Sequence, residues 1–111
     1  MDALEHYRQT IENLLNEYAA IPYAHGEFKT VTVFDHNSDR YLLMNIGWDK
    51  KRRDHGCLVH IDIIDGKFWI QQDGTEDGIA LDLEEAGIDK EKIVLGFREP
   101  ELRPCTGYAT V

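Results

Sequence analysis

The sequence predicts an α+β domain in which an N-terminal helix packs on an antiparallel four-stranded meander sheet. Three observations predict this fold. Apolar residues recur at helical spacing in residues 3–20, and four segments between residues 28 and 72 alternate like strands and are separated by turn sequences. After Gly74 the apolar spacing becomes helical again. Short helices and a short C-terminal strand or irregular tail should therefore complete a single domain over residues 1–111.

The first helix is predicted over residues 3–20 from an apolar stripe with spacings of three and four, formed by Leu4, Tyr7, Ile11, Leu14 and Tyr18. Asp2 is placed to cap this helix, and Pro22 to end it before a loop at residues 23–26. The stripe is shorter than three heptads, which favours packing on the protein's own sheet over a coiled coil with a partner.

Two hairpins are predicted in the middle of the chain. The first joins residues 28–35 and 40–48 through the turn sequence at 36–39. The second joins residues 57–64 and 67–72 through Asp65-Gly66, a pair typical of a type I′ turn.

The Asp65-Gly66 turn sets the expected register of the second hairpin. The core face should pair Ile63 with Phe68, Ile61 with Ile70, and Val59 with Gln72, and the first helix should pack on this face. The opposite face should pair Asp62 with Trp69, and His60 with Gln71.

The C-terminal third has weaker signals. Ile79, Leu83 and Ala86 are spaced for one face of a short helix, with Gly87 as the residue just beyond its C-cap. A single turn through Lys92 and a short strand at residues 93–95 follow. Residues 98–111 contain two prolines and a glycine and should be irregular.

Composition limits the function. The 111 residues contain 21 Asp and Glu against 12 Lys and Arg, a net charge of −9. A protein that binds duplex DNA normally presents a basic face, so DNA contact is expected to be indirect or local. The two cysteines predict free thiols rather than a disulfide framework. We find no signal peptide and no apolar run long enough for a membrane span, so we expect a cytoplasmic protein.

One basic cluster stands between the second and third predicted strands: Lys50, Lys51, Arg52 and Arg53, with Trp48 just before it. Such a cluster can bind phosphates or an acidic protein surface. The alternative is a solvated hairpin loop whose charges protect the end of the sheet. The sequence leaves both readings open.

His60 and Asp62 share a sheet face with Trp69 and Gln71, which raises the question of catalysis or metal binding. No serine is paired with them, and only two plausible ligands converge, so we expect no catalytic residue, no metal site and no cofactor. Asp65-Gly66-Lys67 resembles the end of a metal-dependent nuclease motif, but a hairpin turn explains these residues. This face is a candidate interface instead.

The whole sequence resembles the XisI family, the fdxN-element excision controlling factors of cyanobacteria. The residues that carry the resemblance run nearly end to end: Leu4-Glu5-His6-Tyr7-Arg8, Gly47-Trp48, Lys51-Arg52-Arg53, Gly56-Cys57, His60-Ile61-Asp62-Ile63, Asp65-Gly66-Lys67, Trp69-Ile70-Gln71, Asp73-Gly74-Thr75-Glu76, Ala86-Gly87-Ile88, Ile93-Val94-Leu95-Gly96-Phe97, Pro100 and Arg103. Phe68 stands where the family pattern leads us to expect Ile.

The resemblance implies a non-enzymatic control factor for programmed excision of a DNA element during heterocyst differentiation, a site-specific recombination. It also implies a partner, XisH, whose family resembles nucleases. Two alternatives remain: an antitoxin-like inhibitor of a nuclease partner, or a directionality factor that contacts DNA locally.

A regulator of this kind acts through an interface, with a XisH-like protein or with another copy of itself. Interface centres favour aromatic residues and arginine. We therefore single out one group for partner or nucleic-acid contact: Trp48, Lys50, Lys51, Arg52, Arg53 and Arg103. The second candidate is the sheet face with His60, Asp62, Trp69 and Gln71.

Overall fold

The computed structural model describes residues 3–21 and 27–111. In chain order its elements are the helix α1 (Ala3–Ala19), the strands β1 (Glu27–Asp35), β2 (Arg40–Asp49), β3 (Arg52–Ile64) and β4 (Lys67–Asp73), the helix α2 (Ile79–Glu85), the 3-10 turn η1 (Lys90–Lys92), the strand β5 (Ile93–Leu95) and the 3-10 helix η2 (Pro100–Cys105). Asp2, Pro22 and the loop at 23–26 lie outside the described residues.

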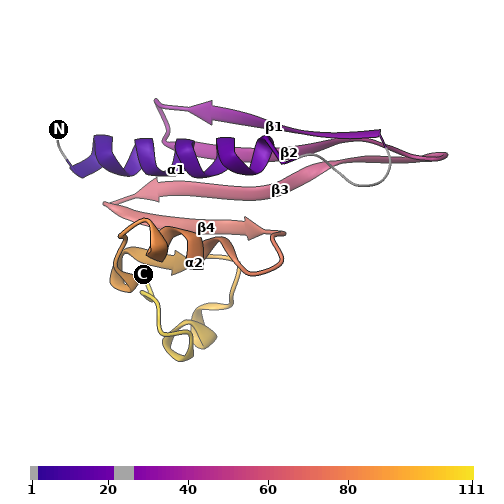
Figure 1. The fold of residues 1–111 in the computed structure, drawn as a ribbon. Helices are drawn as coiled ribbons and strands as arrows, with labels where there is room; N and C mark the ends of the chain where they lie inside the picture. The colour runs from indigo at the N-terminus through magenta and orange to yellow at the C-terminus, as the bar shows by residue number, and fades with distance from the viewer. Residues whose placement is uncertain (1–2, 22–26) are drawn as a thin grey trace.

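The strands form one sheet in the order β1-β2-β3-β4-β5 (Figure 1). Strands β1 to β4 are antiparallel neighbours, which confirms the predicted meander. The short C-terminal strand also exists, and it joins the sheet as β5, parallel to β4. A parallel neighbour needs a crossover connection, and α2 with η1 provides it. The α+β class is thus confirmed, with a fifth strand in the sheet.

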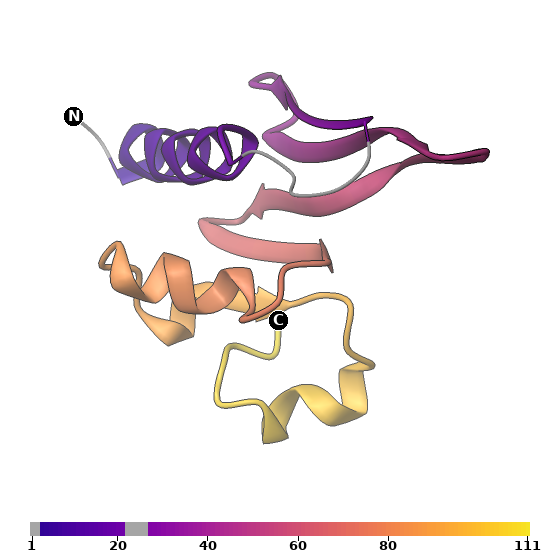
Figure 2. The ribbon, with the colours of Figure 1, turned by 45° about the vertical axis from the view of Figure 1, so that its right-hand side comes forward.

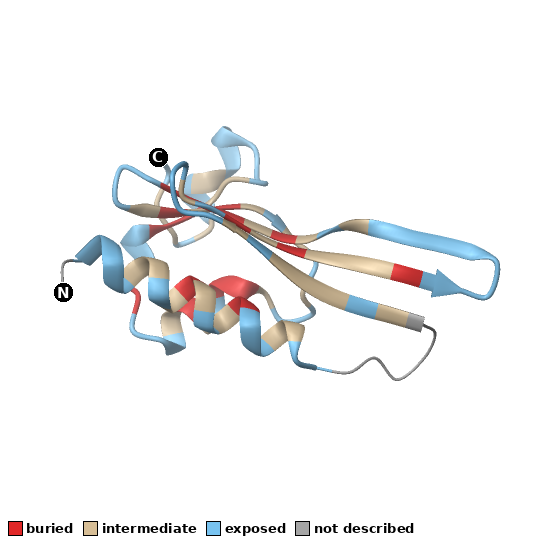
Figure 3. Ribbon diagram, turned by 90° about the horizontal axis from the view of Figure 1, so that it is seen from above, coloured by how far each residue is buried: buried red, intermediate tan, exposed pale blue. Residues whose placement is uncertain are grey.

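Both helices cover the same face of the sheet (Figure 3). The core lies between them and this face, and it contains the fully buried side chains of Ile11 and Leu15 from α1. It also contains the whole predicted core face of the second hairpin: Val59, Ile61, Ile63, Phe68 and Ile70. The ring of Tyr7 packs edge-on against that of Phe68, with centroids 4.8 Å apart. The predicted packing of α1 on this face is confirmed.

The helix α2 ends as its sequence predicts. Gly87 has a φ of 99°, a conformation that glycine adopts without steric cost. Its N–H donates to the carbonyl of Glu84 at 2.9 Å, and the N–H of Ile88 donates to that of Leu83 at 3.0 Å. These two bonds form a Schellman motif, which turns the chain sharply toward β5.

The second hairpin confirms the predicted turn and three of the five predicted cross-strand pairs. Asp65 and Gly66 both have positive φ, 51° and 76°, as a type I′ turn requires. The pairs Ile63–Phe68, Ile61–Ile70 and Asp62–Trp69 form as expected.

Beyond Ile61 the predicted register is wrong. The pairing shifts between His60 and Ile61, so His60 faces Gln72 instead of Gln71, and Val59 faces Asp73 instead of Gln72. Gln71 is the extra residue of a β-bulge in β4. Strict alternation, from which we derived the register, does not reveal where a strand takes up an extra residue.

The third strand is longer than predicted. It begins at Arg52 rather than at residue 57, so Arg52 and Arg53 are strand residues instead of loop residues. Only Lys50 and Lys51 form the turn, and Lys50 has a φ of 57°. The turn end of the β2–β3 hairpin, residues 46–55, reaches past the end of α1 (Figures 1 and 2). We call residues 46–55 the arm.

The C-terminal segment is irregular outside η2, as predicted, but it is tied to the sheet. The N–H of Ala109 donates to the carbonyl of Ile93 at 2.8 Å, and Ala109 forms a parallel bridge with Val94. The Tyr108 hydroxyl donates to a carboxylate oxygen of Glu84 at 2.7 Å. Burial, and then this hydrogen bond, raise the pKa of Tyr108 to about 12. These contacts cover the outer edge of β5.

Candidate partner-binding surfaces

The sheet face turned away from the helices carries an apolar band over β1 and β2. Alternate residues of a strand share a face, and cross-strand partners share it too. The pairs Val33–Leu42, Val31–Met44 and Lys29–Ile46 are therefore on the face that also carries His60, the partner of Leu42 on β3. We call this surface the open face, formed by Lys29, Val31, Val33, Leu42, Met44, Ile46, Trp48 and Arg53.

The open face is accessible. Val33 is 49% exposed and Trp48 46% exposed. None of its apolar residues belongs to the hydrophobic core of the described chain or packs against it. A contiguous apolar surface of this kind is typical of a protein–protein interface.

The arm divides the predicted basic cluster between two faces. Trp48 pairs with Arg53 in the register, and the Arg53 guanidinium lies 5.2 Å from the centre of the Trp48 ring, within the range of a cation–π interaction. Arg52 precedes Arg53 in the same strand, so it points to the opposite face, and it pairs with Asp49. Lys50 and Lys51 are exposed at the tip. The structure thus brings Trp48 and Arg53 together and separates Arg52 from them.

His60, Asp62 and Gln71 do meet, as the sequence suggested. Asp62 is 7% exposed, and its carboxylate lies 2.7 Å from His60 Nε2. It also accepts a hydrogen bond from the Gln71 amide at 3.4 Å, and Arg40 Nε lies 3.7 Å away. Sequence reasoning missed Arg40, which faces Asp62 across the sheet.

These groups supply hydrogen-bond and charge partners to a buried carboxylate. In the described residues no serine or cysteine side chain is hydrogen-bonded to His60, and no group of three or more His, Cys, Asp or Glu is placed to hold a metal ion. The two cysteines are free, as expected, and both are exposed. Partial burial of the Cys57 thiol raises its pKa. A raised pKa makes a thiol less nucleophilic at neutral pH.

Trp69 is held by its own chain. The guanidinium of Arg103 lies 5.2 Å from the centre of its ring, and Arg103 Nε also donates to the carbonyl of Arg98 at 3.1 Å. Gly96 packs so closely that an added Cβ would lie 3.2 Å from Trp69 Cε3. The structure therefore places Arg103 beside Trp69, not beside the arm with which the sequence grouped it. An interface role for Trp69 stays a prediction.

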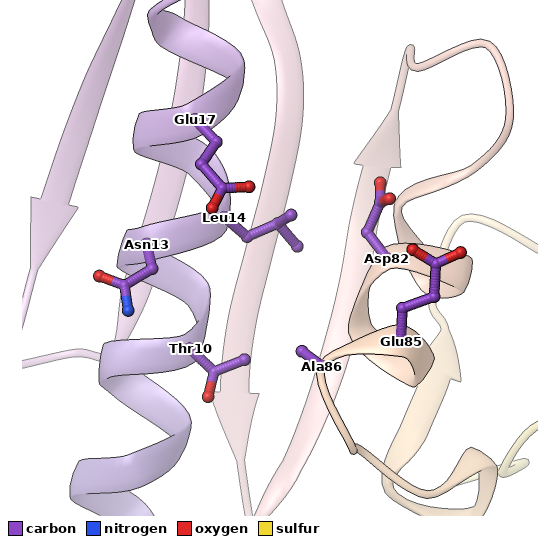
Figure 4. A pocket seen from close by; sticks show the side chains of 7 residues that line it. All are labelled: Thr10, Asn13, Leu14, Glu17, Asp82, Glu85 and Ala86. Carbon is purple, nitrogen blue, oxygen red and sulfur yellow. The ribbon is translucent and has the colours of Figure 1, made fainter.

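A groove of about 370 Å³ lies between α1 and α2 (Figure 4). Carboxylates of Glu17 on α1 and of Asp82 and Glu85 on α2 line it. Asp82 accepts a 2.5 Å hydrogen bond from the Tyr18 hydroxyl, whose pKa is raised by burial and by this bond. Sequence reasoning missed this groove, because α1 and α2 are separated by the four meander strands and neither helix has a motif.

Together these features define an α+β domain whose helices cover one sheet face and whose other face is open over the first two strands. A family model described as XisI protein matches residues 1–110, and the chain belongs to the XisI family. The resemblance that the sequence suggested is thereby confirmed.

Two solved structures from Anabaena variabilis ATCC 29413 are similar over 99% of this chain and 100% of their own. One is a XisI-like protein with 32% sequence identity and a TM-score of 0.88. The other is the fdxN element excision controlling factor XisI, with 33% identity and a TM-score of 0.80. No match is found among curated protein sequences. Of the helices in residues 3–21 and 27–111, none combines the length and apolar character needed to cross a bilayer.

Proposed function

We propose that this protein is a non-enzymatic control factor for excision of a DNA element, acting through a XisH-like partner of nuclease fold. The observation that carries the proposal is the similarity along the full chain to the excision controlling factor XisI. Programmed excision during heterocyst differentiation is the setting that this similarity suggests.

The open face is the surface that we assign to the partner. Interface centres favour aromatic residues and arginine. Trp48 and Arg53 are exposed, stacked on one another, and continuous with the apolar residues of β1 and β2. His60 and Asp62 border this band, and Trp69 stands beyond them on β4.

Co-expression of the tagged chain with a XisH-like protein tests the proposal. We expect the two proteins to co-elute in gel filtration, and Trp48→Ala to reduce the complex. Leu81→Ala is a matched control, because Leu81 is 49% exposed but lies on α2, on the other side of the sheet. Separate elution of the wild-type proteins, or equal loss of complex in both variants, would contradict the assignment.

A second candidate function is antitoxin-like inhibition of the nuclease partner. The groove between α1 and α2 favours it, because the carboxylates of Glu17, Asp82 and Glu85 could occupy a basic nuclease surface as phosphates do. A nuclease assay with and without this protein separates the functions. An inhibitor lowers cleavage in proportion to its concentration, and Glu17→Gln with Glu85→Gln relieves the inhibition, whereas a control factor leaves cleavage unchanged.

A further inference from the structure

The strand β1 forms one edge of the sheet. It has nine residues and pairs with β2 without any register shift, and among the described residues no strand lies on its other side. Natural edge strands are usually short, bulged, rich in lysine or interrupted by proline, because a free edge pairs with other chains. Between Phe28 and Phe34, β1 contains one charged residue, Lys29, and no proline.

The opposite edge of the sheet shows the contrast. There the C-terminal segment covers β5, where Ala109 bonds to Ile93. The helix α1 lies over the sheet and leaves the outer side of β1 uncovered (Figure 1). Within residues 3–21 and 27–111, the β5 edge is thus protected and the longer β1 edge is open.

The sequence of β1 is complementary to itself in one antiparallel register. With a two-fold axis at Thr32, Lys29 of each copy faces Asp35 of the other, and Val31 faces Val33. All four residues belong to the same side of the strand, so the paired side chains share a face. Shifting the register by two residues either way separates Lys29 from Asp35.

Asp35 is suited to this role. It is exposed, and hydrogen bonds from Ser38 and from the backbone of Asn37 hold the pKa of its carboxyl below the usual range. Its carboxylate is therefore negatively charged at neutral pH. Opposite charges and β-branched pairs facing each other across strands stabilise antiparallel pairing.

We propose that two copies of this chain associate by antiparallel pairing of β1 with β1, centred on Thr32, to form a continuous ten-stranded sheet. Most homodimers have two-fold symmetry with a self-complementary interface. In this arrangement both helix layers lie on the same side, and the two open faces join through Val31 and Val33. The dimer does not depend on a XisH-like partner, so its test is independent of the proposed function.

Sedimentation equilibrium of the wild-type chain and two charge-reversed variants tests the dimer. Lys29→Glu places like charges opposite each other twice and should weaken self-association about tenfold or more, as should Asp35→Lys. An equimolar mixture of the two variants restores both opposite-charge pairs and should form heterodimers. Lys92→Glu, an exposed reversal in η1, is the control and should dimerise like the wild type.

Cross-linking gives a second readout that leaves Asp35, and the turn it helps to form, unchanged. In a Cys57→Ser, Cys105→Ser background, Thr32→Cys faces its own copy across the axis, at a Cα separation of about 4.5–5.5 Å that suits a disulfide. Oxidation should link this variant into dimers, and should not link Val33→Cys, which faces Val31. A monomeric wild-type chain, or equal cross-linking of both variants, would overturn the proposal.

Discussion

Asp39 connects the first helix to the sheet. It has a φ of 51°, and its carboxylate accepts hydrogen bonds from Arg8 at 2.8 Å and from the Tyr41 hydroxyl at 3.0 Å. The bond from Arg8 holds the pKa of Asp39 below its usual range. The same contact raises the pKa of Arg8, and burial raises that of Tyr41. The sequence did not single out this contact, because it joins residues 31 positions apart.

Asp39→Asn tests this connection without changing the backbone, because asparagine also tolerates positive φ. We expect a loss of about 1–3 kcal/mol in the free energy of unfolding at neutral pH, the usual value of a hydrogen bond to a charged group. The pKa of Asp39 is lower in the folded than in the unfolded protein. Its contribution to the free energy of unfolding is therefore complete above the unfolded pKa of ~3.9 and disappears as the pH falls through the folded pKa.

Urea unfolding between neutral and acid pH measures the effect. The difference in the free energy of unfolding between wild type and variant should be constant above about pH 5 and should shrink below pH ~4. A difference that grows on acidification would contradict the role assigned to Asp39.

A second prediction about single residues concerns the stacking of Arg103 on Trp69. A double-mutant cycle with Trp69→Ala and Arg103→Ala should give a coupling energy of about 0.5–1 kcal/mol, as cation–π pairs at partly exposed sites do. Chemical denaturation followed by circular dichroism measures the four proteins. Additive losses would show that the stacked geometry contributes nothing to stability.

Among the elements, those with local signals were predicted well. The Asp65-Gly66 turn, the core face of the second hairpin and the glycine that ends α2 each follow from a few neighbouring residues. The bulge at Gln71 and the five extra residues of β3, Arg52 to Gly56, were not predicted. Both depend on pairing with a neighbouring strand, and polar residues such as Arg52 become strand residues only because β2 offers hydrogen bonds.

Two glycines, Gly96 after β5 and Gly56 in β3, test how the segment after β5 packs against β4. An added Cβ at Gly96 would lie 2.7 Å from Gln71 Oε1 and 3.1 Å from the Ile70 carbonyl, whereas at Gly56 it would meet no atom within 4 Å. Gly96→Ala should cost about 1–3 kcal/mol, as overpacking does.

Gly56→Ala is the control and should leave stability unchanged or raise it by up to about 1 kcal/mol. Thermal melts of the two variants measure both effects. Equal melting temperatures would mean that the segment after β5 does not pack against β4 as described.

At the scale of the whole molecule, the sheet topology determines which residues form the open face and the acidic groove. The residues of the open face were named only in part from the sequence: Trp48 and Arg53 were, but Val31, Val33, Leu42 and Met44 were not. Each looks like an ordinary strand residue, and only the position of α1 and α2 on the other face shows that neither described helix covers these four. The acidic groove escaped prediction for a similar reason, since two distant helices create it.

Net charge predicts weak contact with DNA. With a charge of −9 and its four clustered cations divided over two faces and a tip, the chain should not bind random duplex DNA tightly at physiological salt. Fluorescence anisotropy with a labelled duplex measures this. Sub-micromolar binding that weakens steeply with salt would favour the directionality-factor alternative, with Lys50 and Lys51 as the first residues to change.

The two arginines of the arm offer the most direct test of the proposed control function. Arg53 stacks on Trp48 at the open face. Arg52 lies on the opposite face of the same strand, so Arg52→Ala removes the same charge from that other face. We would titrate the XisH-like partner into wild type, Arg53→Ala and Arg52→Ala by calorimetry. We expect Arg53→Ala to weaken binding by over ~1 kcal/mol, about fivefold in Kd, and Arg52→Ala to bind like the wild type. Equal affinity of all three proteins, or a larger loss in Arg52→Ala, would contradict this expectation.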